Sequence, residues 1–343
     1  MVEEGSVTLP IEVPETVSKT MSPFYNPDMR LNRETSMAAL STLDGLDAVF
    51  PLAGSGVRAL RCLNEQDVFD EVVVNDINPH FEDRFQEYAE ANGVDLSSVD
   101  VRSTDARSLP FDLRSYDFIE IDPFGSPNKY VDSAVQELRD GGLIAVTATD
   151  TAPLSGTYPT TCERNYWATP LRNAEMHEFG LRILIRKIQL VGAQHERALT
   201  PVLSYADKHY FKTILSCSKS KTGADALLDQ HGRIKRDDTH VGPMWTGSLL
   251  DEEFLNKVDL SFRKGDRVEP LLERLRGEAS IGAFGFVDVH ELAGELSLSG
   301  PPKIRDVIEG LKKIGCKACR TSFSHTGVKT DASKEQVRCV MRD

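Results

Sequence analysis

The 343-residue chain lacks the features that mark several large protein classes. Its six cysteines are too few and too scattered for a disulfide scaffold, so we expect a reducing compartment. Apolar runs such as Leu143–Val146 fall far short of the ~20 residues that a membrane helix needs. The first ten residues have neither the basic start nor the apolar core of a secretory signal. We therefore expect a cytoplasmic protein with no membrane partner.

Positive charge is also scarce, since 40 Lys and Arg stand against 53 Asp and Glu and the net charge is −13. Such a sum argues against a partner as acidic as nucleic acid. The distribution is less one-sided. Residues 301–343 hold ten Lys and Arg against five Asp and Glu, and Asp207–Arg236 hold seven against three. Ordinary solvated surfaces account for such stretches, but so do phosphate-binding patches on an otherwise acidic body.

Between residues 46 and 150, short β-branched runs alternate with amphipathic stretches of helix length, which predicts a parallel sheet with crossover helices. The expected strands are Asp47–Leu52, Glu71–Asn75, Val99–Arg102, Tyr116–Ile121 and Leu143–Thr147. The expected helices are Val57–Leu63, Pro79–Asn92 and Lys129–Arg139, the last with Gly141-Gly142 as its C-cap. A longer helix over 171–191 and a strand pair, Val202–Tyr205 and Phe211–Ser216, follow.

The length of the chain predicts two domains. Residues Ser218–Arg236 are polar and are expected to form a loop. We place an α/β domain over residues 1–217, a polar basic linker over 218–240 and a smaller α+β domain over 241–343. Short helices are expected in that last part at Phe254–Lys257, Glu269–Arg276 and Ile304–Ile314.

A glycine loop joins the first expected strand to the first helix. Gly54 and Gly56 let a ligand approach the backbone at the carboxyl end of the strand, which is the usual ligand edge of a doubly wound sheet. Asp76 ends the next strand, 22 residues after Gly54, where a carboxylate binds the hydroxyls of a ribose. Asp105 follows the third strand and is placed to accept a hydrogen bond from an adenine amino group. A structural turn explains the glycines alone about as well, but not the two acids with them.

The same loop bears on the choice of cofactor. A dinucleotide-binding loop has a third glycine near position 59, where this chain has Ala59 and Leu60. We therefore expect adenosine without a pyrophosphate, and the ligand of that kind is S-adenosylmethionine. Arg58 would lie near its methionine carboxylate or support the loop.

The fourth strand ends in the most specific feature, Asp122-Pro123-Phe124-Gly125. The amino group of a nucleobase is a poor nucleophile because its lone pair is delocalised into the ring. If Asp122 and the carbonyl of Pro123 accept its two hydrogens, the lone pair points at the methyl donor and developing charge is stabilised. Phe124 would stack on the base. An ordinary Asp-Pro turn is the alternative.

Motifs along nearly the whole chain resemble, in the same order, those of the archaeal and eukaryotic tRNA (guanine-26 N2)-dimethyltransferase family. They are FYNPDMRLNRETS from Phe24, AGSGVRALR from Ala53, NDINP from Asn75, IDPFGSP from Ile121, TATDTAPLSGTYP from Thr147 and GPMWTG from Gly242. The resemblance implies a Rossmann-like class I methyltransferase domain with a C-terminal domain that grips tRNA. It also implies one or two methyl transfers from S-adenosylmethionine to the N2 of guanine-26.

The resemblance extends to single residues. It implies cofactor contacts from the two arginines, the two strand-end acids and one alanine: Arg33, Arg58, Asp76, Asp105 and Ala106. Asp122 would be the catalytic acceptor. Phe24 and Phe124 would enclose the guanine after it is flipped out of the stack.

Many members of this family carry a four-cysteine zinc site ahead of the last motif. Here that interval holds only Cys217 with His231 and His240, and no tetrahedral ligand set can be assembled from that spacing. Cys316 and Cys319 form a C-x-x-C, but no second pair follows. We therefore expect no zinc or other metal. A monomer is favoured.

Three alternatives stay open. An amino-methyltransferase of DNA or ribosomal RNA uses a similar D-P-P-type tetrapeptide, although the first and last motifs favour tRNA. A nucleotide-dependent oxidoreductase is possible on the same sheet, but the missing third glycine argues against it. A catalytically silent RNA-binding module would not need the full set of acids at the strand ends. The acidic surface suggests a salt-tolerant archaeal host as a hypothesis.

Overall fold

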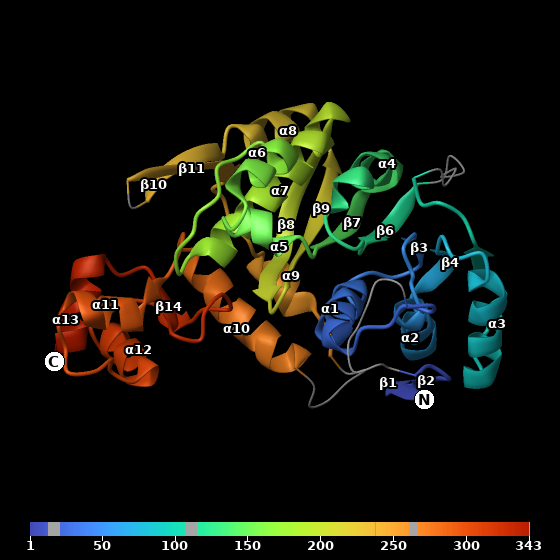
Figure 1. Cartoon of the computed structure of the whole chain (residues 1–343), viewed down its shortest axis with the longest axis horizontal. Helices are drawn as coiled ribbons and strands as arrows, with labels where there is room; N and C mark the ends of the chain where they lie inside the picture. The colour runs from blue at the N-terminus through green and yellow to red at the C-terminus, as the bar shows by residue number, and fades with distance from the viewer. Residues whose placement is uncertain (13–20, 108–114, 237, 261–266, 343) are drawn as a thin grey trace.

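A computed structural model describes residues 1–12, 21–107, 115–236, 238–260 and 267–342. Its centre is a seven-stranded sheet in the order β5-β4-β3-β6-β7-β9-β8, parallel except for β9, which is antiparallel to both neighbours (Figure 1). The strands are β3 (Leu46–Phe50), β4 (Phe69–Asn75), β5 (Val99–Arg102), β6 (Tyr116–Ile121), β7 (Leu138–Ala148), β8 (Arg197–Asp207) and β9 (Tyr210–Lys219). The predicted doubly wound sheet is confirmed.

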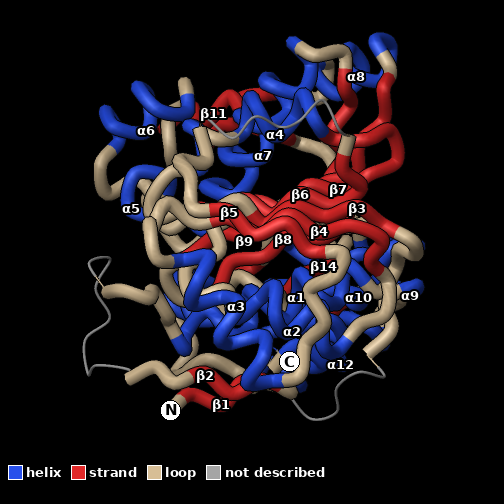
Figure 2. The backbone as a smooth tube through the Cα atoms, turned by 90° about the vertical axis from the view of Figure 1, so that its right-hand side faces the viewer, coloured by secondary structure: helices blue, strands red, loops and turns tan. Residues whose placement is uncertain are grey.

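Helices cover both faces of the sheet, as Figure 2 shows. One face is covered by α1 (Arg30–Leu40), α2 (Val57–Glu65), α3 (Phe81–Asn92), α9 (Glu252–Lys257) and α10 (Val268–Ile281). The other is covered by α4 (Val131–Glu137), α5 (Thr151–Leu154), α6 (Pro159–Tyr166), α7 (Met176–Gln194) and α8 (Lys221–Leu228). Because both faces are buried, β3, β4 and β6 are rich in apolar residues, as is usual for parallel sheets, although each also carries one or two acids. A small hairpin of β1 (Val2–Glu4) and β2 (Val7–Leu9) packs beneath α2 and α3.

The C-terminal residues form a second core. A three-stranded sheet in the order β12-β14-β13 packs with three helices around Val289, Leu311 and Val328. Its elements are β12 (Val287–Asp288), α11 (Val289–Glu295), α12 (Ile304–Lys313), β13 (Ala318–Arg320), β14 (Gly327–Thr330) and α13 (Lys334–Arg342). The predicted α+β character of this part is confirmed.

The expected loop over Ser218–Arg236 is wrong. The segment forms α8 and then β10 (His231–Arg236), which pairs with β11 (Thr239–Trp245). Ser220 caps α8 by accepting a hydrogen bond from the Gly223 N–H at 2.9 Å. The sequence is polar because only a narrow stripe of each element is buried, and the polar backbone is satisfied by capping and pairing. The proposed division at 218–240 stays a prediction, and the β11 side chains Val241, Met244 and Trp245 belong to the core around α7.

Two smaller expectations are also wrong. Gly141-Gly142 do not cap a helix, because α4 ends at Glu137 and Leu138, extended and fully buried, already begins β7. The helix expected from residue 171 begins at Met176, because a turn precedes it in which Asn173 Oδ1 accepts the Glu175 N–H at 2.8 Å. Among the described residues, no helix is both long enough and apolar enough to cross a membrane.

Candidate active site

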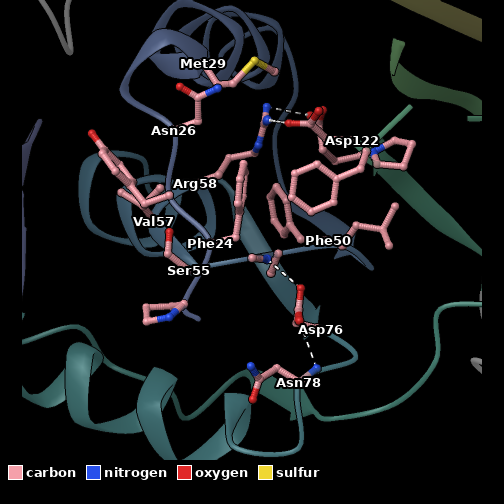
Figure 3. Close-up of a pocket in the computed structure, with 18 of the residues that line it drawn as sticks. Phe24, Asn26, Met29, Phe50, Ser55, Val57, Arg58, Asp76, Asn78 and Asp122 are labelled. Carbon is pink, nitrogen blue, oxygen red and sulfur yellow. Dashed lines mark hydrogen bonds and ion pairs between the residues drawn. The ribbon is translucent and has the colours of Figure 1, made fainter. Parts of the chain in front are cut away.

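A cavity of about 860 Å³ opens at the carboxyl ends of β3, β4 and β6. Its walls come from the segment before α1, the glycine loop after β3, the turn after β4 and the loop after β6 (Figure 3). Parallel strands end together at this edge, which is where doubly wound sheets bind ligands, and the volume suits a small organic molecule. The predicted site residues that line the cavity are Phe24, Arg33, Gly54, Arg58, Asp76, Asp122, Pro123 and Phe124.

A hydrogen bond joins the glycine loop to Asp76. The Gly54 N–H donates to Asp76 Oδ2 at 2.8 Å, and the Asn78 N–H donates to Oδ1 at 3.0 Å (Figure 3). Each carboxylate oxygen keeps capacity for a second hydrogen bond, as a ribose diol requires. Gly56 has φ +79°, and a Cβ there would lie 2.5 Å from Phe85 Cδ2. Only glycine allows this tight turn over Phe85, and the loop brings the backbone of Gly54 to the cavity, where an adenosine ligand needs close approach.

One buried residue that sequence reasoning missed joins the strand ends. The amide nitrogen of Asn75 donates to Pro51 O at 2.9 Å and to Thr104 O at 3.0 Å, and its oxygen accepts from the Thr104 N–H at 3.0 Å. It thereby ties the ends of β3, β4 and β5 together. The signal was present in the sequence, because Asn75 is the one amide that ends an otherwise apolar run, VVVN.

The structure does not bring Asp105 and Ala106 to the cavity, since neither is among the described residues that line it. Asp105 forms an ion pair with Arg107 at 2.5 Å, and that hydrogen-bonded partner lowers the pKa of Asp105 to about 2. Ala106 is buried. Residues 108–114, which follow directly, lie outside the described part of the chain. The adenine contacts of Asp105 and Ala106 stay predictions.

Asp122 is held by Arg58 from α2. Figure 3 shows the Arg58 guanidinium aimed at the Asp122 carboxylate, and the two form an ion pair through Nη2 and Oδ2. Arg58 also donates to Ser36 Oγ at 2.7 Å and to Asn32 Oδ1 at 2.9 Å, both on α1. Burial alone would lower the pKa of Arg58, but the carboxylates of Glu120 and Asp122 outweigh it and raise the pKa. The guanidinium therefore stays charged and faces Asp122, while its cofactor contact stays a prediction.

A second buried pair lies behind the first, and sequence reasoning missed it. Lys212 Nζ of β9 lies 2.5 Å from Glu120 Oε1 of β6, and the other oxygen of Glu120 lies 3.2 Å from Arg58 Nη1. Lys212 is fully buried and Glu120 is 3% exposed. Burial lowers the pKa of Lys212. The signal for both was a charged residue inside an apolar strand, YDFIEI and YFKTIL. The two cations and two anions balance, so Asp122 belongs to a neutral buried network.

Phe24 and Phe124, which are predicted to enclose the base, meet at the cavity. Their ring centroids are 4.3 Å apart at an interplanar angle of 82°, and Phe124 is 52% exposed. Rings in edge-to-face contact leave no room for a purine between them. A base can enter only if one ring moves, and the exposed Phe124 is the freer of the two.

Arg33 lines the cavity but directs its guanidinium to Glu4 of β1. Arg33 Nε donates to Glu4 Oε1 at 2.7 Å, and Arg61 Nη1 donates to the same oxygen at 2.8 Å. Burial raises the pKa of Glu4, but the two arginines outweigh it and hold that pKa at about 2. Arg33 also donates to the backbone oxygen of Asn26 at 3.2 Å. Its position therefore fixes the segment that carries Phe24.

The loop after β6 is held by hydrogen bonds from residues 149–166. This segment includes most of the TATDTAPLSGTYP motif, to which sequence reasoning assigned no role. Tyr166 donates to Asp150 at 2.7 Å and shares a hydrogen bond of 2.9 Å with Ser126 Oγ, and the Gly125 N–H donates to Thr149 Oγ1 at 2.7 Å. Among the described residues, no three His, Cys, Asp or Glu side chains are arranged to hold a metal ion.

Comparisons with known proteins identify the family. The model of the N2,N2-dimethylguanosine tRNA methyltransferase family matches residues 5–239 and 230–342. A tRNA (guanine(26)-N(2)/guanine(27)-N(2))-dimethyltransferase of Aquifex aeolicus is 32% identical over 100% of this chain and 96% of its own. A tRNA (guanine(26)-N(2))-dimethyltransferase of Methanocaldococcus jannaschii is 32% identical over 98% of this chain and 97% of its own.

A solved structure extends the agreement to the fold. Trm1 from Pyrococcus horikoshii, in complex with S-adenosyl-L-methionine, superposes with a TM-score of 0.88 at 28% identity over 99% of both chains. The resemblance inferred from the motifs is thereby confirmed. With matches over both parts of its length, this chain belongs to the N2,N2-dimethylguanosine tRNA methyltransferase family.

Proposed function

We propose that this protein transfers one or two methyl groups from S-adenosylmethionine to the exocyclic N2 of guanine-26 in tRNA. The observation that carries the proposal is one cavity that joins the Gly54–Asp76 pair, suited to a ribose, to the Asp122-Pro123-Phe124 corner, suited to a base amine. The named activities of the relatives from Aquifex aeolicus and Methanocaldococcus jannaschii support it.

The residues in the cofactor half of the cavity would bind and orient S-adenosylmethionine. Asp76 would accept the ribose hydroxyls, and the loop of Gly54 and Gly56 would leave space for the sugar against the backbone. Asp105 and Ala106 would contact the adenine, and Arg33 and Arg58 would contribute positive charge beside the methionine end. When bound, S-adenosylmethionine supplies an electrophilic methyl group on a sulfonium sulfur.

The substrate half prepares the amine. Asp122 and the Pro123 carbonyl would accept the N2 hydrogens, so that the nitrogen lone pair points away from both acceptors and toward the methyl donor. As the N–C bond forms, positive charge develops on N2, and the Asp122 carboxylate stabilises it and is placed to take the released proton. Arg58 holds one oxygen of Asp122, which leaves the other for the amine. In a second transfer only one N–H remains for these acceptors.

The aromatic pair would hold the guanine base. Phe24 and Phe124 would separate to admit the flipped guanine and then enclose it. Flipping costs a few kcal/mol of unstacking, which two aromatic faces help to offset. The contact between the rings in the free protein also covers the apolar surface that the base would later cover.

The remaining parts of the proposal concern partners. The C-terminal α+β part would grip the tRNA with the basic residues of 301–343. We expect the protein to act in the cytoplasm, as a monomer and without zinc.

Nucleoside analysis of a tRNA transcript incubated with the protein and the methyl donor tests the function. N2-methylguanosine and N2,N2-dimethylguanosine are expected, and both should vanish when guanine-26 of the transcript is replaced by adenine. Equal methylation of that altered transcript, or of a ribosomal RNA fragment or a DNA duplex, would favour another nucleic acid as substrate.

A further inference from the structure

The first observation is an exposed tryptophan held in a strained backbone conformation. Trp167 follows α6 with φ 55°, in the left-handed region, and is 54% exposed. Its N–H donates to Glu163 O at 3.0 Å, and Thr169 pairs with Gly242 of β11 on its other side. Backbone strain of this kind persists only where the surrounding contacts enforce it, and it gathers at functional sites. The exposed indole is an aromatic surface on which another flat group can stack.

Three cations on α7 and β10 lie near one another, and one of them contacts this tryptophan. Lys187 Nζ of α7 lies 3.3 Å from the centre of the Trp167 ring. Arg186 precedes it on the same helix, and burial together with the positive charge of Arg233 on β10 lowers the pKa of Arg186. Burial and the charge of Arg186 lower the pKa of Lys187 in turn. We name these four residues, Trp167, Arg186, Lys187 and Arg233, the α7 basic surface.

The positive charges of this surface repel one another. In the part of the chain that the structure describes, none of the three has a carboxylate within ion-pair distance. Arg186 Nε and Nη1 are buried and have no hydrogen-bond partner at all among those residues. Buried donors are almost always satisfied, so an orphaned guanidinium beside like charges indicates an anionic partner that is bound in function.

Neighbouring arginines on the same two elements behave differently. Arg182, one turn earlier on α7, is paired with Glu178 at 2.8 Å, and Arg236, three residues after Arg233 on β10, is paired with Glu175 at 3.0 Å. Carboxylate partners are therefore present on this side of the fold. The α7 basic surface is the stretch from which they are missing.

The position of this surface points to the polyanion. Asn165 O, two residues before Trp167, accepts from Asn128 Nδ2 at 2.9 Å, and Tyr166 is bonded to Ser126. Ser126 belongs to the same loop as Asp122 and Phe124, and Asn128 lies in the short 3-10 helix Pro127–Lys129 that follows it. The Trp167 end of the surface therefore adjoins the loop that carries Asp122, on the sheet part of the molecule.

We propose that the α7 basic surface binds the phosphodiester backbone of the substrate RNA beside the catalytic loop, with the guanidinium groups of Arg186 and Arg233 on phosphate oxygens. Arginine suits this contact because its planar donors match phosphate, and the free face of Trp167 suits an unstacked base or a sugar. The inference rests on the proposed function, since RNA is the polyanion which that function supplies.

The test is the salt dependence of tRNA binding by the full-length protein. The double variant Arg186→Gln/Arg233→Gln should bind a tRNA transcript more weakly, and the slope of log K against log[KCl] should fall by about one for each phosphate that the variant no longer neutralises. The KM for tRNA should rise, while kcat and the Kd for S-adenosylhomocysteine stay near the wild-type values. The matched control is Lys221→Gln/Lys257→Gln, which removes the same charge from two exposed lysines that already pair with Glu196 and Glu253. It should leave the slope unchanged.

Arg233→Glu alone is the second variant. Arg233 is exposed, so a loss of binding in this variant does not arise from a damaged core. A wild-type slope and Kd in both Arg variants would overturn the proposal. A wild-type protein that binds tRNA through these arginines but does not methylate guanine-26 would overturn the proposed function and leave the surface standing.

Discussion

The buried pair of Lys212 and Glu120 is the most direct place to test the network behind Asp122. Lys212→Met removes a fully buried ammonium whose Nζ lies 2.5 Å from Glu120 Oε1. Removing one partner of such a pair leaves an uncompensated buried charge, which costs about 3–5 kcal/mol of the free energy of unfolding. We expect a cost within that range, because Glu120 is only 3% exposed and water cannot screen its charge.

The loss should also reach Asp122, the proposed catalytic carboxylate. Without Lys212, the nearest cation to Glu120 is Arg58, whose Nη1 already lies 3.2 Å from Glu120 Oε2. Arg58 is then drawn toward Glu120 and away from Asp122. We expect kcat to fall by about tenfold or more, since even 1.4 kcal/mol of lost transition-state stabilisation has that effect.

A second substitution separates charge from packing. In Lys212→Met/Glu120→Gln the Arg58–Asp122 pair stays intact and the interior is again neutral. The double variant should therefore regain about 1–3 kcal/mol relative to the sum of the two single variants.

Urea unfolding measures the stability, and single-turnover methyl transfer measures the activity. The matched control is Lys257→Met, which breaks an exposed pair with Glu253 on α9 and should cost far less, because solvent screens that pair. A cost for Lys212→Met as small as that of the control, or strict additivity in the double variant, would refute the network.

Three further predictions concern the site and the fold. Asp122→Asn keeps the shape but removes the charge, so kcat should fall about 10²–10⁴-fold while calorimetry gives a nearly unchanged Kd for S-adenosylhomocysteine; retention of a tenth of the wild-type kcat would contradict its role. Gly56→Ala should lower the free energy of unfolding by more than about 1 kcal/mol, because the backbone has φ +79° there and the new Cβ would lie 2.5 Å from Phe85 Cδ2. Gly93→Ala is the control for backbone strain alone, because Gly93 has φ +67° and a Cβ there would meet no atom. Burial raises the pKa of Glu278 from 4.5 to about 7, so the folded state binds the proton more tightly. Stability should therefore be greatest below about pH 4.5 for this group, fall by roughly 3 kcal/mol as the pH rises toward 7, and lose that dependence in Glu278→Gln.

Local patterns carried much of the architecture. Strands such as Tyr116–Ile121 were predictable because both faces of a parallel sheet are buried and, apart from Asp117 and Glu120, their residues are apolar. The glycine loop was predictable because positive φ and close approach leave glycine as the only suitable residue. The hairpin of β10 and β11 was not, because its sequence is polar and its pairing depends on residues that lie far away on α7.

By itself, the sequence determined the family, the sheet and the order of the chemical groups at its edge, because these depend on residue types at short spacings. Only the tertiary structure determined which charged groups lie in contact with one another. Arg58 had no partner in its own helix, and Glu120 and Lys212 are 92 residues apart, yet the fold buries them beside Asp122 in one neutral network. The same long-range packing left Arg186 without a carboxylate among the described residues. Electrostatic energy depends on distance and burial in space, and neither can be read from positions along a chain.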